Sequence, residues 1–252
     1  MSQEDSGGKF ASRRAAAHRT PIPDRGLWQL AWPSMAAFAL QASLSFVDML
    51  FVARLGGDAV AGVGVGSQMH FIVPAALAAV ITGTVALVAR ESGANRNSEA
   101  AQVLQVSLVL AASIGLLISL TAPWAPFAIR LFGTSSQVAE IGSEYLSILL
   151  IGSVPFAVGL TLASAMRGAG DVRTPLLIAA VINAINVVFD YVLIFGRWGA
   201  PAMGAPGSAA ASVIAFSLGA LVYLLLWLRG KLALARVPLD LMASEPKPSR
   251  PT

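Results

Sequence analysis

Apolar residues in this sequence gather in six long blocks separated by short polar connections. The blocks lie near residues 27–53, 62–89, 101–123, 145–166, 174–196 and 207–228. Each is long enough for a helix that crosses a lipid bilayer, which takes about 20 apolar residues. The blocks lack the period-two alternation of a membrane β-barrel, and a helix satisfies its own backbone hydrogen bonds in lipid. The pattern therefore predicts an all-α integral membrane protein built as a six-transmembrane-helix bundle.

The segments around these blocks are polar or rich in turn residues. Residues 1–26 are polar and basic, and residues 231–252 are rich in proline. We interpret both as cytoplasmic tails, the second one disordered, on either side of a transmembrane bundle spanning 27–230. The longest connection, 124–144, is amphipathic and is expected to lie along the membrane interface. The run "GVGVG" (62–66) indicates close helix packing through small residues.

Lysine and arginine are distributed unevenly between the two sides that six spans would create. The two tails, Arg229 directly after the last block, and the second and fourth connections together carry 14 of the 17 basic residues, and the other three connections carry Arg54, Arg130 and Arg197. Basic residues stay in the cytoplasm. Both termini are therefore predicted to be cytoplasmic, and a different number of helices would destroy this asymmetry.

The composition agrees with a membrane protein and argues against other classes. The chain is 56% hydrophobic and 12% charged, whereas soluble domains carry about 25% charged residues. It has no cysteine and two histidines, which excludes disulfides and thiolate metal sites and leaves too few ligands for most histidine clusters. The sequence offers no nucleophile–base pair, so we expect neither an enzyme nor a metal site. The net charge of +4 reflects membrane topology, so no nucleic-acid partner is expected.

Two acidic residues lie inside the predicted spans, Asp48 in the first and Asp190 in the fifth. Both helices run from cytoplasm to exterior, and the two residues precede Arg54 and Arg197 by six and seven positions. Each is then about 10 Å inside the outer boundary of the membrane. A carboxylate at the centre of a membrane helix costs on the order of 3 kcal/mol, and taking up a proton reduces that cost. The matched depth predicts a shared proton-binding or cation-binding site.

Polar residues accompany each carboxylate on one face of its helix, because they are spaced by seven on the first helix and by three and four on the fifth. The first stripe is Ser34, Gln41 and Asp48 with Ser45 beside it, and the second is Asn183, Asn186 and Asp190. We expect these residues to line a polar cavity. The alternative is that the aspartates lie at a wet interface and only hydrogen-bond a neighbouring helix. His70 either lines the same cavity or is a hydrogen-bonded packing residue.

Five longer motifs occur in order along the chain: "FVDMLFVARLGGDAVAGVGVG" (46–66), "LFGTSSQVAEIGSEYLSI" (131–148), "MRGAGDVRTP" (166–175), "NVVFDYVLIFG" (186–196) and "MGAPGSAAAS" (203–212). Together they resemble the N-terminal half of the multidrug and toxic compound extrusion (MATE) family, over about residues 27–230. Single motifs are weakly specific because glycine abounds in membrane helices. Their order on the matching helices makes the resemblance specific.

The resemblance implies a fold and a function. Members of the family have two six-helix bundles related by a pseudo-two-fold axis, and they expel lipophilic, often cationic compounds in exchange for protons or sodium ions. The chain is therefore expected to be half of a twelve-helix transporter in the bacterial inner (plasma) membrane, in contact with small lipophilic or cationic substrates and membrane lipid. Protons rather than sodium ions are expected to drive it, with no other cofactor.

The resemblance also assigns individual residues of this chain to positions in the family's motifs. The first-helix aspartate of the family matches Asp48, and its fifth-helix Asn-x-x-x-Asp matches Asn186 and Asp190. A sixth-helix hydroxyl of the family corresponds to Ser212 or to Ser208.

The length departs from the family, because the chain has six predicted spans where the family has twelve. We expect either pairing with a second six-helix bundle, from the same chain or a sister subunit, or an inactive truncated product. A non-transporting membrane subunit also stays open. A lipid-linked precursor flippase of related fold would need cationic residues along its cavity, and none of the predicted spans contains lysine or arginine.

Overall fold

The computed structural model describes residues 26–229, which form helices joined by short turns, without a strand in that range. The predicted tails, apart from Gly26, lie outside the described residues. The all-α prediction is confirmed. The helices are α2 (Gly26–Ala53), α3 (Gly57–His70), α4 (Ile72–Gly93), α5 (Asn97–Ser119), the 3-10 turn η1 (Ala122–Trp124), α6 (Ala125–Arg130), α7 (Ser136–Ile151), α8 (Ser153–Gly168), α9 (Arg173–Phe195) and α10 (Ala205–Leu228).

Helix length and hydropathy together identify the membrane-spanning segments. Four stretches of the described chain qualify, namely 57–93, 97–130, 173–195 and 205–228, and a fifth qualifies if α7 and α8 form one bent span. The described apolar helix within α2 is shorter and covers Ala39–Ala53. Because α2 has 28 residues in all, which exceeds the length of a bilayer span, we count it as the sixth span.

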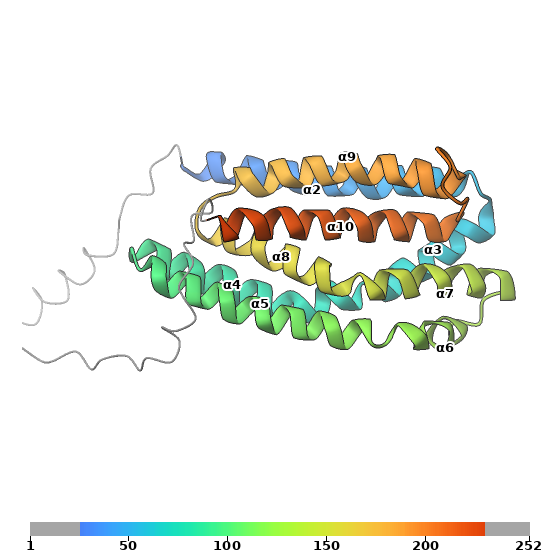
Figure 1. Cartoon of the computed structure of the whole chain (residues 1–252), viewed down its shortest axis with the longest axis horizontal. Coiled ribbons are helices and arrows are strands. Elements are labelled where there is room, and N and C mark those ends of the chain that lie inside the picture. Colours follow the sequence, from blue (N-terminus) through green and yellow to red (C-terminus); the bar gives the residue numbers. More distant parts are fainter. Residues whose placement is uncertain (1–25, 230–252) are drawn as a thin grey trace, which may run out of the picture.

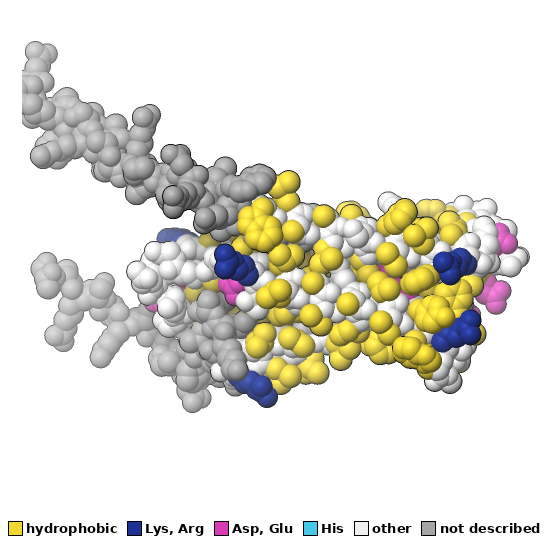
Figure 2. Space-filling view, turned by 90° about the horizontal axis from the view of Figure 1, so that it is seen from above, with side chains coloured by type: hydrophobic (Ala, Val, Ile, Leu, Met, Phe, Trp, Pro, Cys, Tyr) yellow, Lys and Arg dark blue, Asp and Glu magenta, His cyan; other side chains and the backbone are white. Residues whose placement is uncertain are grey.

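The helices lie along the long axis of the molecule, with α2 beside α9 on one side, α4 and α5 on the other, and α10 and α8 between them (Figure 1). The turns after α4 and α8 lie at the same end of the molecule as the start of α2 and the end of α10, and we call this the basic end. Of the described arginines it holds Arg90, Arg96, Arg167, Arg173 and Arg229. Figure 2 shows hydrophobic side chains over the middle of the visible flank and charged ones toward the two ends, as a bilayer requires.

The fourth span bends by 53° between α7 and α8, and Pro155 explains the bend. Proline has no N–H and its ring displaces the carbonyl four residues earlier, so the carbonyl of Ile151 loses its helical partner. The hydroxyl of Ser119 donates to that carbonyl over 3.3 Å, which satisfies a group that lipid could not. A side chain at Gly152 would meet Val213 of α10, so the bend also brings two helices close together.

The beginning of the fourth span differs from the sequence prediction, which placed the helix at 145–166 and assigned 124–144 to an interfacial connection. The helix begins at Ser136, and α6 occupies the start of the supposed connection. Ser135 caps the helix, since its hydroxyl accepts from the N–H of Val138 over 3.3 Å. The prediction was wrong because Glu140 and Glu144 interrupt the apolar pattern while the helix continues through them.

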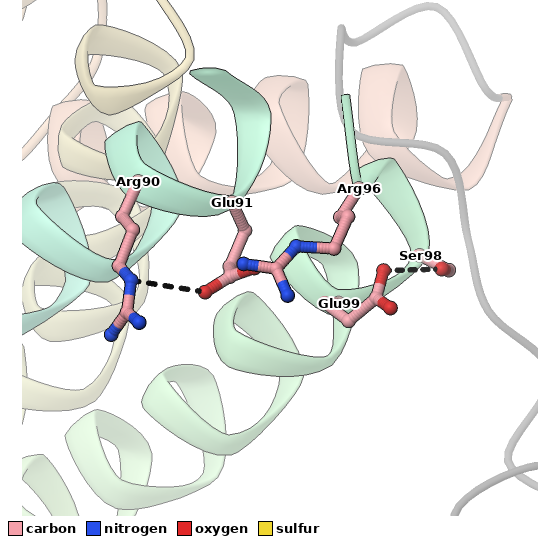
Figure 3. Close-up of polar contacts among 5 residues, drawn as sticks. All are labelled: Arg90, Glu91, Arg96, Ser98 and Glu99. Carbon is pink, nitrogen blue, oxygen red and sulfur yellow. Dashed lines mark hydrogen bonds and ion pairs between the residues drawn. The ribbon is translucent and has the colours of Figure 1, made fainter. Parts of the chain in front are cut away.

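The turn between α4 and α5 is closed by charged side chains at the basic end (Figure 3). The guanidinium of Arg96 lies 2.8 Å from Glu91 Oε2, and Arg90 lies 3.8 Å from Glu91 Oε1. The hydroxyl of Ser98 donates to Glu99 over 2.7 Å. Both arginine side chains are at least half exposed while Glu91 is mostly buried, so each ion pair contributes on the order of 1 kcal/mol. The contacts fix the turn rather than forming a site.

The connection between α9 and α10 folds back on the last turn of α9. Gly196 ends α9 with φ 65°, a left-handed conformation that glycine adopts without steric cost. The N–H groups of Met203 and Gly204 then donate to the carbonyls of Leu193 and Ile194 over 2.8 and 3.3 Å. This return places the first turns of α10 directly against α9 at the level of Asp190.

Candidate functional site

Asp48 and Asp190 lie together between α2 and α9, as their matched depth predicted. Their carboxyl groups are within hydrogen-bonding range of each other. Asp190 is completely buried and Asp48 is half-buried. Two carboxylates in contact repel each other unless a proton or a cation lies between them. Of the two carboxyl groups, that of Asp48 is the more exposed.

Aromatic contacts one turn away hold α2 and α9 in the register that brings the carboxyl groups together. The ring of Phe51, three residues after Asp48, lies 6.5 Å from that of Tyr191 and 6.1 Å from that of Phe195. The rings of Tyr191 and Phe195 are 5.8 Å apart. Edge-on contacts at such distances contribute about 0.5–1.5 kcal/mol each beyond burial. The residue spacing of three and four places them on the same helix faces as the carboxylates.

Asn186 connects the two carboxylates to α10. Its amide satisfies its neighbours when Nδ2 faces the carboxyl groups, donating to Asp190 Oδ2 over 3.1 Å and to Asp48 Oδ1 over 3.2 Å. Its Oδ1 then accepts from the N–H of Ser212 over 3.2 Å. In the opposite orientation Nδ2 would donate to the Ser212 hydroxyl over 3.4 Å, and the amide oxygen would face the carboxylate oxygens. The first orientation is assigned because it pairs donors with acceptors.

One oxygen of the buried pair remains without a partner. Asp190 Oδ1 is buried and makes no hydrogen bond with any residue that the structure describes. Leaving a charged oxygen unpaired away from water is costly. That oxygen is therefore the atom of the pair whose burial no described residue compensates.

Tyr145 joins a fourth and a fifth helix, α7 and α3, to this cluster and was not among the residues that the sequence suggested. Its hydroxyl accepts from the hydroxyl of Ser67 on α3 over 3.2 Å and contacts Ser208 on α10. A Cβ at Gly66 would lie 2.7 Å from the tyrosine ring, so the "GVGVG" run makes room for it, as predicted. Tyr145 lies close enough to interact electrostatically with Asp48 and Asp190.

We call these seven residues the carboxylate cluster: Asp48, Asp190, Asn186, Ser212, Ser208, Tyr145 and Ser67. It joins α2, α3, α7, α9 and α10 at one level of the bundle. Ser208 and Ser212, which the sequence left as alternatives for one role, occupy different positions in it, the first beside Tyr145 and the second beside Asn186.

The amides Gln41 and Asn183 lie elsewhere. They line a cavity of about 460 Å³ between α8, α9 and α10, and Asn183 Nδ2 donates to the carbonyl of Leu40 over 3.3 Å. Neither Asp48 nor Asp190 lines that cavity. Each amide is seven residues from the carboxylate on its own helix, which is about 10 Å along the axis. Each predicted polar stripe is therefore divided: its amide lines the cavity, and its carboxylate belongs to the carboxylate cluster.

Ser45 and His70 belong neither to the carboxylate cluster nor to the lining of the cavity. The hydroxyl of Ser45 is exposed and bonds the carbonyl of Gln41 in its own helix over 3.3 Å. The ring of His70 packs against that of Phe156, with centroids 5.9 Å apart, and the ring of Phe156 lines the cavity. His70 therefore packs against a residue of the cavity wall and does not itself line the cavity. Within residues 26–229, no group of three histidine, cysteine or acidic side chains could hold a metal ion.

The predicted spans contained no lysine or arginine, but the observed helices do. Arg167 is one of the residues that line the cavity. The sequence boundary of the fourth span at residue 166 excluded it, whereas α8 continues to Gly168 and carries Arg167 in its last turn.

Replacing Tyr145 with phenylalanine tests whether the cluster depends on the tyrosine hydroxyl. The change removes the contacts with Ser67 and Ser208 and keeps the ring that packs at Gly66. We expect the bundle to lose about 1 kcal/mol of stability, measured as a lower melting temperature in detergent. Ser113→Ala serves as the matched control, because that exposed hydroxyl bonds only its own helix. Equal melting temperatures for Tyr145→Phe and the control would show that the hydroxyl does not hold the helices together.

Comparison with known proteins places these observations in context. Residues 33–192 match the family model described as MatE. The chain is 30% identical over 195 residues to the probable multidrug resistance protein NorM of Thermotoga maritima, covering 77% of this chain and 42% of that protein. It is 25% identical over 196 residues to the uncharacterized transporter YisQ of Bacillus subtilis, covering 77% and 43%.

Solved structures of membrane transporters also match the fold of this chain. A MOP superfamily transporter from Pyrococcus furiosus, for which a binding pocket of reverse polarity is described, aligns with TM-score 0.76 at 26% identity over 86% of this chain and 47% of that one. A multidrug resistance MATE family transporter in an outward-facing conformation aligns with TM-score 0.76 at 26% identity, over 88% and 48%. The chain thus spans about half the length of the relatives it matches.

Proposed function

The chain belongs to the MatE family of membrane transporters, and on that premise we propose that it forms one six-helix bundle of a two-bundle exporter. The exporter would expel lipophilic, often cationic compounds across the bacterial inner membrane in exchange for protons. Both ends of the chain would lie in the cytoplasm, in keeping with the distribution of basic residues. The names of the relatives from Thermotoga maritima and Bacillus subtilis, a multidrug resistance protein and a transporter, support export of small molecules.

The observation that carries this proposal is the contact between Asp48 and Asp190 under Asn186. With a proton between the carboxyl groups their repulsion is removed, and Asn186, which donates to both, holds α2 against α9. Loss of that proton restores the repulsion between Asp48 and Asp190 and favours separation of α2 from α9, which gives two arrangements of the helix. A cationic substrate and a proton then favour opposite arrangements, and linkage requires that each lowers the affinity for the other.

The donors around the pair favour a proton over a sodium ion. Hard cations need several oxygen ligands. Asn186 presents its Nδ2 to the carboxyl groups and its oxygen to Ser212. The amide therefore supplies hydrogen bonds to the pair and no ligand oxygen. A proton that binds at the unpartnered Asp190 Oδ1 needs no further oxygen ligand, whereas a sodium ion there needs several.

Proteoliposomes provide the direct test. The protein is reconstituted and loaded with ethidium, a lipophilic cation, and an imposed proton gradient or a sodium gradient of equal size is applied. We expect dye movement against its gradient with the proton gradient and none with the sodium gradient, followed by ethidium fluorescence. Dye movement with the sodium gradient alone would show that sodium, not the proton, is the coupling ion. No movement with either gradient would show that the bundle does not transport the dye.

A second candidate follows from length, because the chain spans about half of its relatives. A single bundle could be a non-transporting or inactive part that needs a sister bundle. Native mass spectrometry of the detergent-purified assembly separates these cases. Two copies together with dye transport support self-pairing, whereas one copy without transport supports the need for a sister. The flippase alternative loses support, since the described cavity offers one cation and a pyrophosphate calls for several.

A further inference from the structure

The cavity between α8, α9 and α10 extends from the middle of the bundle to its basic end. Its lining on α8 runs from Pro155 to Arg167, which corresponds to about 18 Å along the helix. That length is close to half of the ~30 Å hydrocarbon core, or one leaflet of a bilayer. The cavity volume of about 460 Å³ lies within the range of ligand sites.

The walls of the cavity are apolar over most of that length. Phe156, Leu160, Leu176, Ile182 and Phe216 contribute to them. The rings of Phe156 and Phe216 touch edge-on with centroids 5.1 Å apart, which closes the inner part. A ligand that fills this space must therefore be apolar over most of its length.

The mouth of the cavity carries a single formal charge. Arg167 is the one charged residue among the described residues that line it. Its Nη2 donates to the hydroxyl of Ser164 over 2.7 Å, and within residues 26–229 it forms no ion pair. The nearby hydroxyl of Tyr223 donates to the carbonyl of Pro175 over 3.4 Å, and Asp171 accepts from the N–H groups of Arg173 and Thr174. No other residue of the described range accepts from the remaining donors of the guanidinium, which leaves them for a ligand.

We propose that this cavity binds an anionic phospholipid of the leaflet at the basic end, with its phosphate on Arg167 and one acyl chain between α8 and α9. Guanidinium groups bind phosphate oxygens with paired hydrogen bonds, and basic pockets between transmembrane helices on the cytoplasmic side bind anionic head groups. A cation is disfavoured there, because the one charge is positive and the carboxylate cluster lies outside the cavity. This site goes beyond the proposed transport, and its test does not depend on transport.

The test measures lipid binding by native mass spectrometry on the full chain, delipidated in detergent. Phosphatidylglycerol is titrated against phosphatidylcholine with identical acyl chains. We expect Arg167→Gln to weaken phosphatidylglycerol binding about tenfold, the effect of one charge-assisted hydrogen bond, and to leave phosphatidylcholine binding within twofold. Arg173→Gln is the matched control, because Arg173 lies at the same end and does not line the cavity.

A second variant tests whether the cavity binds an acyl chain. This test remains valid even if Arg167→Gln does not fold. Ala179 lines the cavity, and Ala179→Phe fills it, so binding of both lipids is expected to fall at least fivefold. Three outcomes would overturn the proposal. They are an equal loss in Arg173→Gln, wild-type binding in Ala179→Phe, and competition by glycerol 3-phosphate as effective as that by the lipid, which would assign the site to a free phosphate.

Discussion

Replacement of Asp190 with asparagine is expected to reduce proton-driven ethidium export to background while the protein still inserts and folds. The side chain keeps its shape and remains buried, but it can no longer gain or lose a proton. Asp48 then has no second carboxylate with which to share a proton, so proton binding no longer relieves a repulsion between α2 and α9, and the two arrangements of α2 are no longer coupled to the proton gradient. Export is measured in proteoliposomes and folding by the melting temperature in detergent. Asp48→Asn is expected to behave in the same way, because the two carboxyl groups form one unit.

The matched control for this loss is Asp58→Asn. Asp58 is an exposed aspartate in the first turn of α3, so the change removes one carboxylate of the same bundle outside the carboxylate cluster. Export by Asp58→Asn should equal that of the wild type. If Asp190→Asn exports ethidium at the wild-type rate with the same dependence on the proton gradient, the carboxylate pair is not the coupling site.

The positions of the helices and of the carboxylate pair followed from hydropathy and depth, because lipid imposes strong constraints on both. A charged residue in an apolar block is conspicuous, and six or seven residues to a flanking arginine give its depth directly. Asp48 and Asp190 could be paired on this ground without any knowledge of helix packing. Their contact through Asn186 depends on the rotation of α9 about its axis, which the spacing of Asn186 and Asp190 supplied.

The division of the polar stripes could not be foreseen. Residues spaced by seven share a helix face, yet they differ in depth by about 10 Å. Gln41 and Asn183 therefore reach the cavity, whereas Asp48 and Asp190 reach each other. The side chains of α8 and α10 decide at which depth in the bundle a cavity forms. The sequences of α2 and α9 alone therefore cannot predict it.

Tyr145 was missed for a related reason. It is the first residue of the predicted fourth span, 145–166, and directly follows the segment 124–144 that was assigned to an interfacial connection, so nothing in the sequence placed it opposite other helices. Its role depends on the approach of α3 at Gly66 and of α10 at Ser208. The glycine run did indicate close packing, but a run of small residues does not say which side chain fills the space opposite.

Replacement of Gly207 with alanine is expected to have the second large effect, on both stability and export. A Cβ at Gly207 would lie 2.8 to 2.9 Å from backbone atoms of Leu193 and Ile194 on α9, and backbone atoms cannot move aside as a side-chain end can. The first turn of α10 must then shift away from α9, next to Ser208 and one turn from Ser212. Overpacking of this kind costs about 1–3 kcal/mol, which corresponds to a fall of about 5 °C in the melting temperature.

Gly64→Ala provides the control that separates crowding from the change of residue. Gly64 lies within α3, and a Cβ there would meet nothing within 4 Å. In that open position alanine favours the helix by up to about 1 kcal/mol, so Gly64→Ala should melt at the wild-type temperature or above. The two substitutions are chemically identical and should therefore act with opposite sign. Gly207→Ala should also lower ethidium export, because the Ser212 N–H that holds Asn186 moves with α10. A Gly207→Ala protein as stable and active as Gly64→Ala would mean that α9 and α10 tolerate separation, and the carboxylate cluster would then not depend on their close contact.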